Sequence, residues 1–174
     1  MRKFSRFREL QWQLLGLQFV DNADADPDTD GVDVFTKHEH FIMDYSKGQG
    51  QESLYKAYTV DKFRYPDDPR LHNEDHSAAS DFVRRIEGKR FLYLTGMYAK
   101  QLSVYPMKRE FAVPCPIFTR EHSTWPTNQP ATGSWLWHDK NGDGLIQSNE
   151  DESLGAEDDS IWVGKLIVTG DCTL

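Results

Sequence analysis

The sequence contains little of several features that mark particular classes of protein. Cysteine occurs only twice in 174 residues, at Cys115 and Cys172, which is too few to decide the redox compartment. Spacing alone leaves open whether these two cysteines pair. No apolar run approaches the roughly 20 residues of a membrane span, so no membrane insertion is expected. The 20 basic residues are outnumbered by 28 acidic ones, and the resulting net charge of −8 argues against binding to nucleic acid, whose phosphates require a basic surface.

Signals for export and for catalysis are also missing. The N-terminus starts basic, but glutamines interrupt the apolar stretch that follows, and no small-residue cleavage site is evident. The sequence contains no Asn-x-Ser/Thr acceptor, no Gly-x-Ser-x-Gly nucleophile elbow and no phosphate-binding glycine-rich loop before a helix. No catalytic residue is therefore assigned. The chain carries no convincing export signal, and we expect that it is either complete or a piece of a longer product.

Short segments of alternating apolar and polar residues recur along the chain, and turn signals separate them. Aromatic residues, which favour strands, make up 13% of the sequence. This pattern predicts a single all-β domain over residues 1–174. The predicted strands span residues 10–20, 31–37, 40–45, 54–60, 89–95, 101–105, 110–113, 117–119, 134–138 and 161–168.

Residues 77–95 allow two interpretations. Phe82–Ile86 and Lys89–Thr95 can form a hairpin about Glu87-Gly88. Alternatively, Ser77–Glu87 can form a short helix that ends at Gly88. The β-prone segment 91–95 favours the hairpin. The preceding polar segment 61–80, with two prolines, is interpreted as a surface excursion.

The most specific pattern is the twelve-residue segment DKNGDGLIQSNE at positions 139–150. Short oxygen-bearing side chains stand at its first, third and fifth positions, glycine at the sixth and glutamate at the twelfth. Ca²⁺ prefers about six to eight oxygen ligands, which alternate side chains of a tight loop can aim at one centre. Glycine permits the sharp turn, and glutamate is long enough to close the shell with both oxygens. The expected ligands are the side chains of Asp139, Asn141, Asp143 and Glu150, and the backbone carbonyl of Leu145.

This segment resembles the EF-hand calcium loop, and every diagnostic position matches. The resemblance implies Ca²⁺ as the bound ion. An EF-hand has a helix on each side, but here Pro130 and Gly133 oppose an entering helix, and the exit allows at most a short helix before Gly155. The loop is therefore expected on β-structure, which argues against a sensor that opens a helix pair. The alternative is a polar turn between strands, which would explain the glycines but not the spacing of the carboxylates.

Two further clusters allow a metal or a simpler explanation. Asp26, Asp28 and Asp30 copy the first half of a calcium loop, but the twelfth position is Lys37, so they form either a second cation site or a solvated acidic turn. The histidine pairs have ligand-like spacing but no third ligand nearby in sequence. They are interpreted as surface histidines in polar loops. These pairs are His38 with His40, and His72 with His76.

A second resemblance concerns residues 89–105, which look like the inner strands of a β-propeller blade of the NHL kind. The resemblance implies antiparallel, propeller-like blades, in either a minimal propeller or part of a larger one. A calcium loop between blade strands also fits bacterial surface and secreted propellers. The alternative folds are a β-sandwich or an α+β arrangement with short helices.

Together these patterns predict a calcium-binding structural or recognition module. The ion would order its loop and connect the strand at 135–137 to the strand at 161–168. An isolated loop of this kind is expected to bind calcium at about 10⁻⁴–10⁻³ M, which suits an extracellular or periplasmic location. The expected partners are calcium and a protein or glycan ligand. The alternative is a calcium-stabilised hydrolase that acts on a glycan or an ester.

Overall fold

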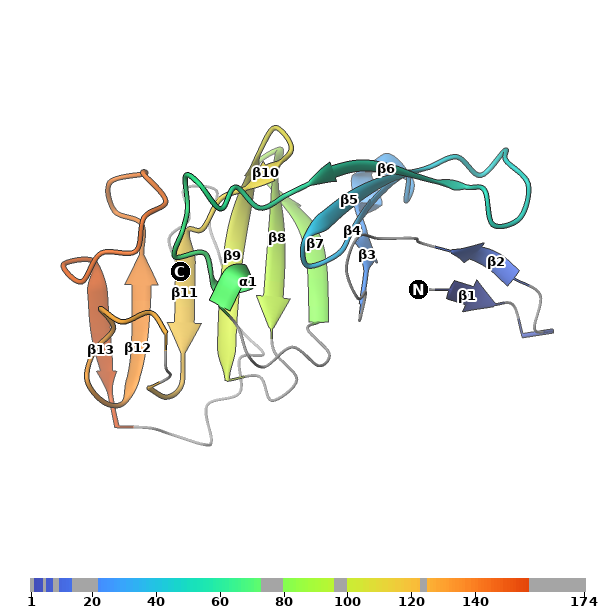
Figure 1. The fold of residues 1–174 in the computed structure, drawn as a ribbon. Coiled ribbons are helices and arrows are strands. Elements are labelled where there is room, and N and C mark those ends of the chain that lie inside the picture. Colours follow the sequence, from blue (N-terminus) through green and yellow to red (C-terminus); the bar gives the residue numbers. More distant parts are fainter. Residues whose placement is uncertain are drawn as a thin grey trace.

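The computed structural model describes residues 2–4, 6–7, 10–13, 22–72, 80–95, 100–122 and 125–156, and the regular structure of these residues is almost entirely antiparallel β-sheet (Figure 1). The all-β prediction is confirmed. No closed barrel or propeller is present in the described ranges. The only helices there are a 3-10 turn, η1 (Pro27–Thr29), and a single turn, α1 (Pro69–His72).

The strands form three sheets. A two-stranded sheet pairs β1 with β2, and a four-stranded sheet has the order β3-β4-β5-β6. A seven-stranded sheet has the order β13-β12-β11-β9-β8-β7, with β10 paired to β9. The strand bounds are β1 (Arg2–Phe4), β2 (Leu10–Gln13), β3 (Asp24–Ala25), β4 (Asp33–Phe35), β5 (Glu39–Met43), β6 (Ser53–Tyr58), β7 (Ser80–Ile86), β8 (Lys89–Thr95), β9 (Gln101–Lys108), β10 (Phe111–Ala112), β11 (Pro116–Thr119), β12 (Ser134–His138) and β13 (Asp151–Gly155).

The hairpin interpretation of residues 82–95 is confirmed. Ile86 pairs with Lys89, and both turn residues have positive φ, 51° at Glu87 and 77° at Gly88. Two positive φ angles give the turn whose twist matches that of the flanking strands. Val83 is fully buried whereas Phe82 is 44% exposed. This change of burial between adjacent residues has the two-residue period of a strand. The helical alternative is wrong.

The segment after residue 150 differs from the prediction. The sequence predicted at most a short helix there. Instead, the segment forms β13, which pairs with β12 from Trp137 opposite Asp151 to Ser134 opposite Gly155. Propensity favours neither state strongly in this short acidic segment, so the hydrogen bonds that β12 offers at its edge decide its conformation. The strand predicted at 161–168 lies outside the described residues.

Apolar side chains cover both faces of the seven-stranded sheet. Leu92 and Tyr105 point toward the face on which Phe35 of β4 packs, whereas Phe91 and Val104 point to the other face. This alternation places neighbouring residues of β8 and β9 on opposite faces. The four-stranded sheet therefore shares a core with one face of the larger sheet.

The segment predicted as a surface excursion is only partly exposed. Arg70 is buried, and its guanidinium donates to Asp68 at 2.6 Å, to Thr59 Oγ1 at 3.0 Å and to the Ala112 carbonyl at 2.6 Å. Its planar fork satisfies several acceptors at once, so a buried charge is paired and hydrogen-bonded. The interpretation as a surface excursion fits exposed residues such as Phe63 but is wrong for Arg70, which fixes the segment against β10.

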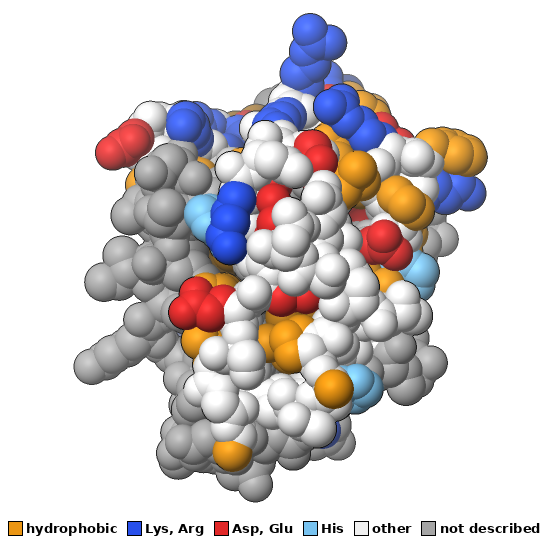
Figure 2. Space-filling view, turned by 90° about the vertical axis from the view of Figure 1, so that its left-hand side faces the viewer, with side chains coloured by type: hydrophobic (Ala, Val, Ile, Leu, Met, Phe, Trp, Pro, Cys, Tyr) orange, Lys and Arg blue, Asp and Glu red, His pale blue; other side chains and the backbone are white. Residues whose placement is uncertain are grey.

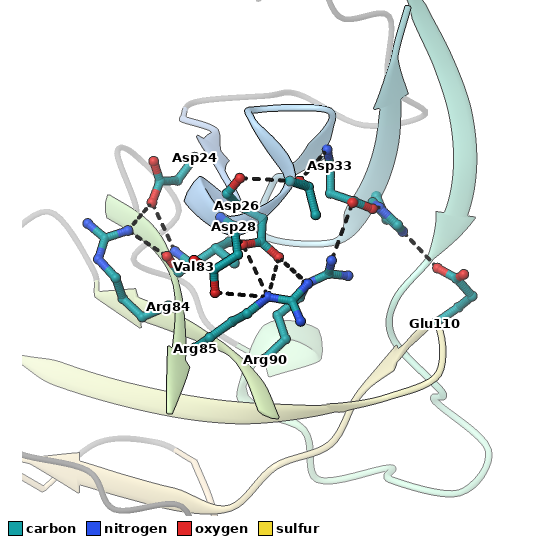
Figure 3. Close-up of polar contacts among 11 residues, drawn as sticks. Asp24, Asp26, Asp28, Asp33, Val83, Arg84, Arg85, Arg90 and Glu110 are labelled. Carbon is teal, nitrogen blue, oxygen red and sulfur yellow. Dashed lines mark hydrogen bonds and ion pairs between the residues drawn. The ribbon is translucent and has the colours of Figure 1, made fainter. Parts of the chain in front are cut away.

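Ion pairs join the four-stranded sheet to the β7–β8 hairpin (Figure 3). At their centre the Asp26 carboxylate, 0% exposed, accepts from Arg85 at 2.9 Å and from Arg90 at 2.6 Å. Burial tends to raise the pKa of Asp26, but hydrogen bonds from Arg85, the Asp28 amide and Arg90 together hold it below its usual value. We call this set the inter-sheet ion network; its members are Asp24, Asp26, Asp28, Asp33, Arg84, Arg85 and Arg90.

His38 gives the fold a pH dependence that can be measured. Its Nε2 lies 3.2 Å from the Arg70 carbonyl oxygen, its ring stacks on Tyr58, and burial lowers its pKa from 6.5 to about 4. Between these values the unfolded chain binds a proton that folded His38 does not, so stability falls as the pH falls. We expect the wild type to lose about 2 kcal/mol more than His38→Gln between pH about 7 and about 5. Urea unfolding of both proteins at the two pH values measures this, and parallel losses would contradict it.

Candidate metal centre

The candidate calcium loop connects β12 to β13 at one end of the seven-stranded sheet (Figure 1). The Asp139 amide donates to the carbonyl of Cys115 at 3.2 Å, which continues the β11–β12 pairing into the loop. Glu150 directly precedes β13. The hairpin therefore holds the first and last loop residues near each other. Cys115 is buried and Cys172 lies outside the described residues, so their pairing stays open.

The side chain of Asp139 points into the loop. Its Oδ1 accepts from the amides of Gly142 at 2.8 Å and Asp143 at 3.0 Å, and its Oδ2 accepts from the amide of Gly144 at 2.9 Å. Gly142 and Gly144 have φ angles of 78° and 75°, a region that glycine adopts without steric cost. The glycines thus allow three amides to face one carboxylate.

The next two predicted ligands face the loop's own donors. Asn141 Oδ1 accepts from the Asp143 amide at 2.8 Å. The Asp143 carboxylate accepts from the Leu145 amide at 2.7 Å and from Gln147 Nε2 at 2.8 Å. The Leu145 side chain is exposed.

Glu150 folds back to the start of the loop. It is 3% exposed, and its Oε1 accepts from the Lys140 amide at 3.0 Å. Its Oε2 accepts from the indole Nε1 of Trp137 at 3.1 Å. The Glu150 side chain, at the twelfth loop position, is therefore held in place by β12 without a bound cation. The sequence analysis missed this role of Trp137, although the residue stands two positions before the loop.

Two regions distant in sequence support the loop. Ile146 packs with Trp135 and Trp137, and Asn128 Nδ2 donates to its carbonyl at 2.8 Å. Tyr65, from the segment that Arg70 anchors, packs against Gly144. Neither Asn128 nor Tyr65 carries a local sequence signal for this role, because only the folded chain brings them to the loop.

The loop carries a net negative charge, because it contains three carboxylates and one lysine. Within the described ranges, no Lys, Arg or His side chain makes an ion pair with Asp139, Asp143 or Glu150. Burial, and to a lesser degree Glu150, raises the pKa of the neighbouring Asp151 to about 6, whereas Lys140 lowers it. Figure 2 shows the end of the molecule with β12 and β13, where basic side chains lie mainly in the upper half, the half in which Figure 1 draws the loop.

The described part of the chain contains no group of three or more His, Cys, Asp or Glu side chains in an arrangement that could hold a metal ion. The oxygens of the loop accept hydrogen bonds from amide and indole donors instead. A carboxylate offers about four lone-pair sites, so it can accept such a hydrogen bond and still face a cation. The predicted ligands also include an amide and a backbone carbonyl, which supply oxygen without charge.

The second acidic segment is neutralised by the protein itself. Asp26 is buried against Arg85 and Arg90, and Asp28 lies 3.3 Å from Arg85. Asp30 is exposed, with a φ of 51°. The interpretation as a solvated acidic turn is wrong for Asp26, and guanidinium groups occupy the position that a second metal ion would need.

The histidine pairs do not form matched sites in the described residues. His40 is buried, so its interpretation as a surface histidine is wrong. His72 stacks on Trp125 with ring centroids 5.0 Å apart, and His76 lies outside the described ranges. His38 faces a backbone carbonyl rather than His40.

Comparisons with protein families, curated proteins and solved structures find nothing that matches this chain. Its function is therefore argued from its own residues. The described segments include no helix with the length and apolar character needed to cross a membrane.

Proposed function

We propose that the loop Asp139–Glu150 binds Ca²⁺ and that the protein is a calcium-stabilised structural or recognition module. The observation that carries this proposal is a contrast between two acidic segments. Asp26 and Asp28 have arginine partners, whereas Asp139, Asp143 and Glu150 make no ion pair among the described residues. The loop gathers three carboxylates against the single positive charge of Lys140, and a cation from solution stabilises such an excess of negative charge.

The ion's role follows from the position of the loop. Asp139 follows β12 and Glu150 precedes β13, so a cation between them ties the two strands at the end of the sheet. The connection to residues 161–168 that the sequence suggested lies outside the described residues. Trp137 and the Lys140 amide hold the buried Glu150 side chain, which supports a twelfth ligand that is in place before the ion binds.

The finer parts of the hypothesis remain as proposals. Antiparallel sheets suit part of a propeller and a β-sandwich equally, and either can act as a scaffold for a protein or glycan ligand. A loop without a paired partner loop is expected to bind calcium weakly, so we place the module where calcium is millimolar, outside the cytosol.

Thermal unfolding tests the proposal. With free Ca²⁺ at about 100 times the dissociation constant, we expect about 2.7 kcal/mol of added stability, a rise of several degrees in melting temperature. Mg²⁺ at the same concentration should add little, because it is smaller and loses its water reluctantly. Excess EDTA gives the baseline. No shift with Ca²⁺ would mean that the loop is only a polar turn.

A pair of conservative variants separates binding from folding. Asp143→Asn removes one charge. The side-chain oxygen of asparagine can still accept from the Leu145 backbone amide, and its NH₂ group can donate to a reoriented Gln147 side chain. Asp30→Asn makes the same change on the other acidic segment, at a positive φ that asparagine tolerates. Asparagine still offers an oxygen ligand but lacks the charge, so we expect Asp143→Asn to reduce the calcium-dependent shift and Asp30→Asn to retain it in full. Equal shifts in the two variants would count against the site.

A further inference from the structure

His40 lies between two carboxylates that come from different parts of the fold. Its Nε2 is 2.6 Å from Asp33 Oδ1 on β4, and its Nδ1 is 2.7 Å from Glu110 Oε2 in the turn between β9 and β10. The ring is buried and stacks on Phe35 with centroids 4.2 Å apart. Figure 3 shows Asp33 and Glu110 on either side of this connection.

The two short distances require two donors. A carboxylate only accepts hydrogen bonds, and a neutral imidazole carries one N–H and one bare nitrogen. Only the imidazolium ion can donate to Asp33 and to Glu110 at once. We propose that His40 is an imidazolium that works as a pH-sensitive joint between the four-stranded sheet and the β9–β10 turn of the seven-stranded sheet.

The surrounding charges favour this assignment. Arg90 approaches the other oxygen of Asp33 at 3.3 Å, but the same guanidinium also serves Asp26 and lies over the Phe35 ring. Arg85 is shared between Asp26 and Asp28. The carboxylates in this set outnumber the guanidinium groups of Arg85 and Arg90; they are Asp26, Asp28, Asp33 and Glu110. A protonated His40 supplies the additional positive charge, and it joins Glu110 to the inter-sheet ion network.

Loss of this proton would open the joint on one side. Asp33 keeps Arg90 as a partner, whereas Glu110 has a 40% exposed side chain that water can reach. The deprotonated ring therefore keeps its N–H toward Asp33 and turns a bare nitrogen toward Glu110. The β9–β10 turn then retains its nearby backbone link, in which the Ala112 amide donates to the Thr59 carbonyl at 2.9 Å.

The test combines the state of the ring with the stability of the whole chain. Nitrogen NMR of His40, recorded from pH about 5 to about 9, reports directly whether one or both ring nitrogens carry a proton. Urea unfolding over the same range is compared between the wild type and Glu110→Gln. Glutamine can accept from a ring N–H or donate to a bare nitrogen, so its bond survives both states of the ring. Glu121→Gln, which alters a half-buried glutamate 2.6 Å from Lys100, controls for the loss of one charge.

We expect both ring nitrogens to be protonated in the lower part of this range. As the second proton leaves, the folded-to-unfolded ratio of the wild type should fall about tenfold relative to Glu110→Gln. Glu121→Gln should follow the wild type. The sign is opposite to that of His38, which destabilises the fold on acidification. A ring that is neutral at pH about 5, or identical profiles for the wild type and Glu110→Gln, would overturn the proposal.

Discussion

Asp26→Ala is expected to lower the free energy of unfolding by about 3–5 kcal/mol, because it removes the buried carboxylate that two half-buried arginines share. Arg85 and Arg90 both donate to Asp26 Oδ2, at 2.9 Å and 2.6 Å. The same side chain accepts from the Asp28 amide at 3.0 Å and so caps η1. Alanine leaves all three donors without this acceptor. Urea unfolding at neutral pH measures the loss directly.

A matched variant in the same network isolates the effect of burial. Asp28 also pairs with Arg85, at 3.3 Å, but its side chain is 57% exposed. Water can replace it, so Asp28→Ala should lose no more than about 1 kcal/mol. If the two alanine variants lost equal stability, water would have to solvate the guanidinium groups after the substitution. The inter-sheet ion network would then not hold the two sheets together.

The position of this network explains why it could not be read from the sequence. Asp26 and Arg85 are 59 positions apart, and nothing local in either segment indicates the other. What the sequence did contain was the alternation of each strand and the Glu87-Gly88 turn, and these predicted the β7–β8 hairpin correctly. Pairing between sheets depends on how such hairpins pack, which is a property of the whole chain.

The same distinction applies to the candidate metal centre. The twelve loop positions form a local pattern in which each residue type has its own chemical reason, so the sequence alone could nominate them. The donors that hold Glu150 and the ring that covers Gly144 are not part of that pattern. Trp137 acts from the preceding strand, and Tyr65 arrives from a segment that Arg70 fixes by contacts to Asp68 and to a backbone carbonyl. The strand β13 was missed for a related reason, since the edge of β12 rather than propensity determines it.

Gly144→Ala is expected to disrupt the loop by two independent effects. The residue has a φ of 75°, where a side chain is strained by about 1–2 kcal/mol. A Cβ atom there would also lie 2.6 Å from Tyr65 Cε1 and 2.8 Å from Val113 Cγ1, both in buried side chains. Overpacking of this kind adds about 1–3 kcal/mol, so the total loss should reach about 2–5 kcal/mol. Chemical unfolding in excess EDTA measures it without a contribution from calcium.

Gly142→Ala provides the comparison that separates the two effects. Its φ of 78° is nearly the same, but no atom lies within 4 Å of the position that a Cβ would take. It should therefore show only the backbone strain, about 1–2 kcal/mol, and should keep a calcium-dependent rise in melting temperature. Gly144→Ala should lose much of that rise as well, because relief of the overlap moves the amide that donates to Asp139. Equal losses in both variants would mean that Tyr65 yields freely, and the loop would then depend on its own glycines rather than on its contact with the rest of the fold.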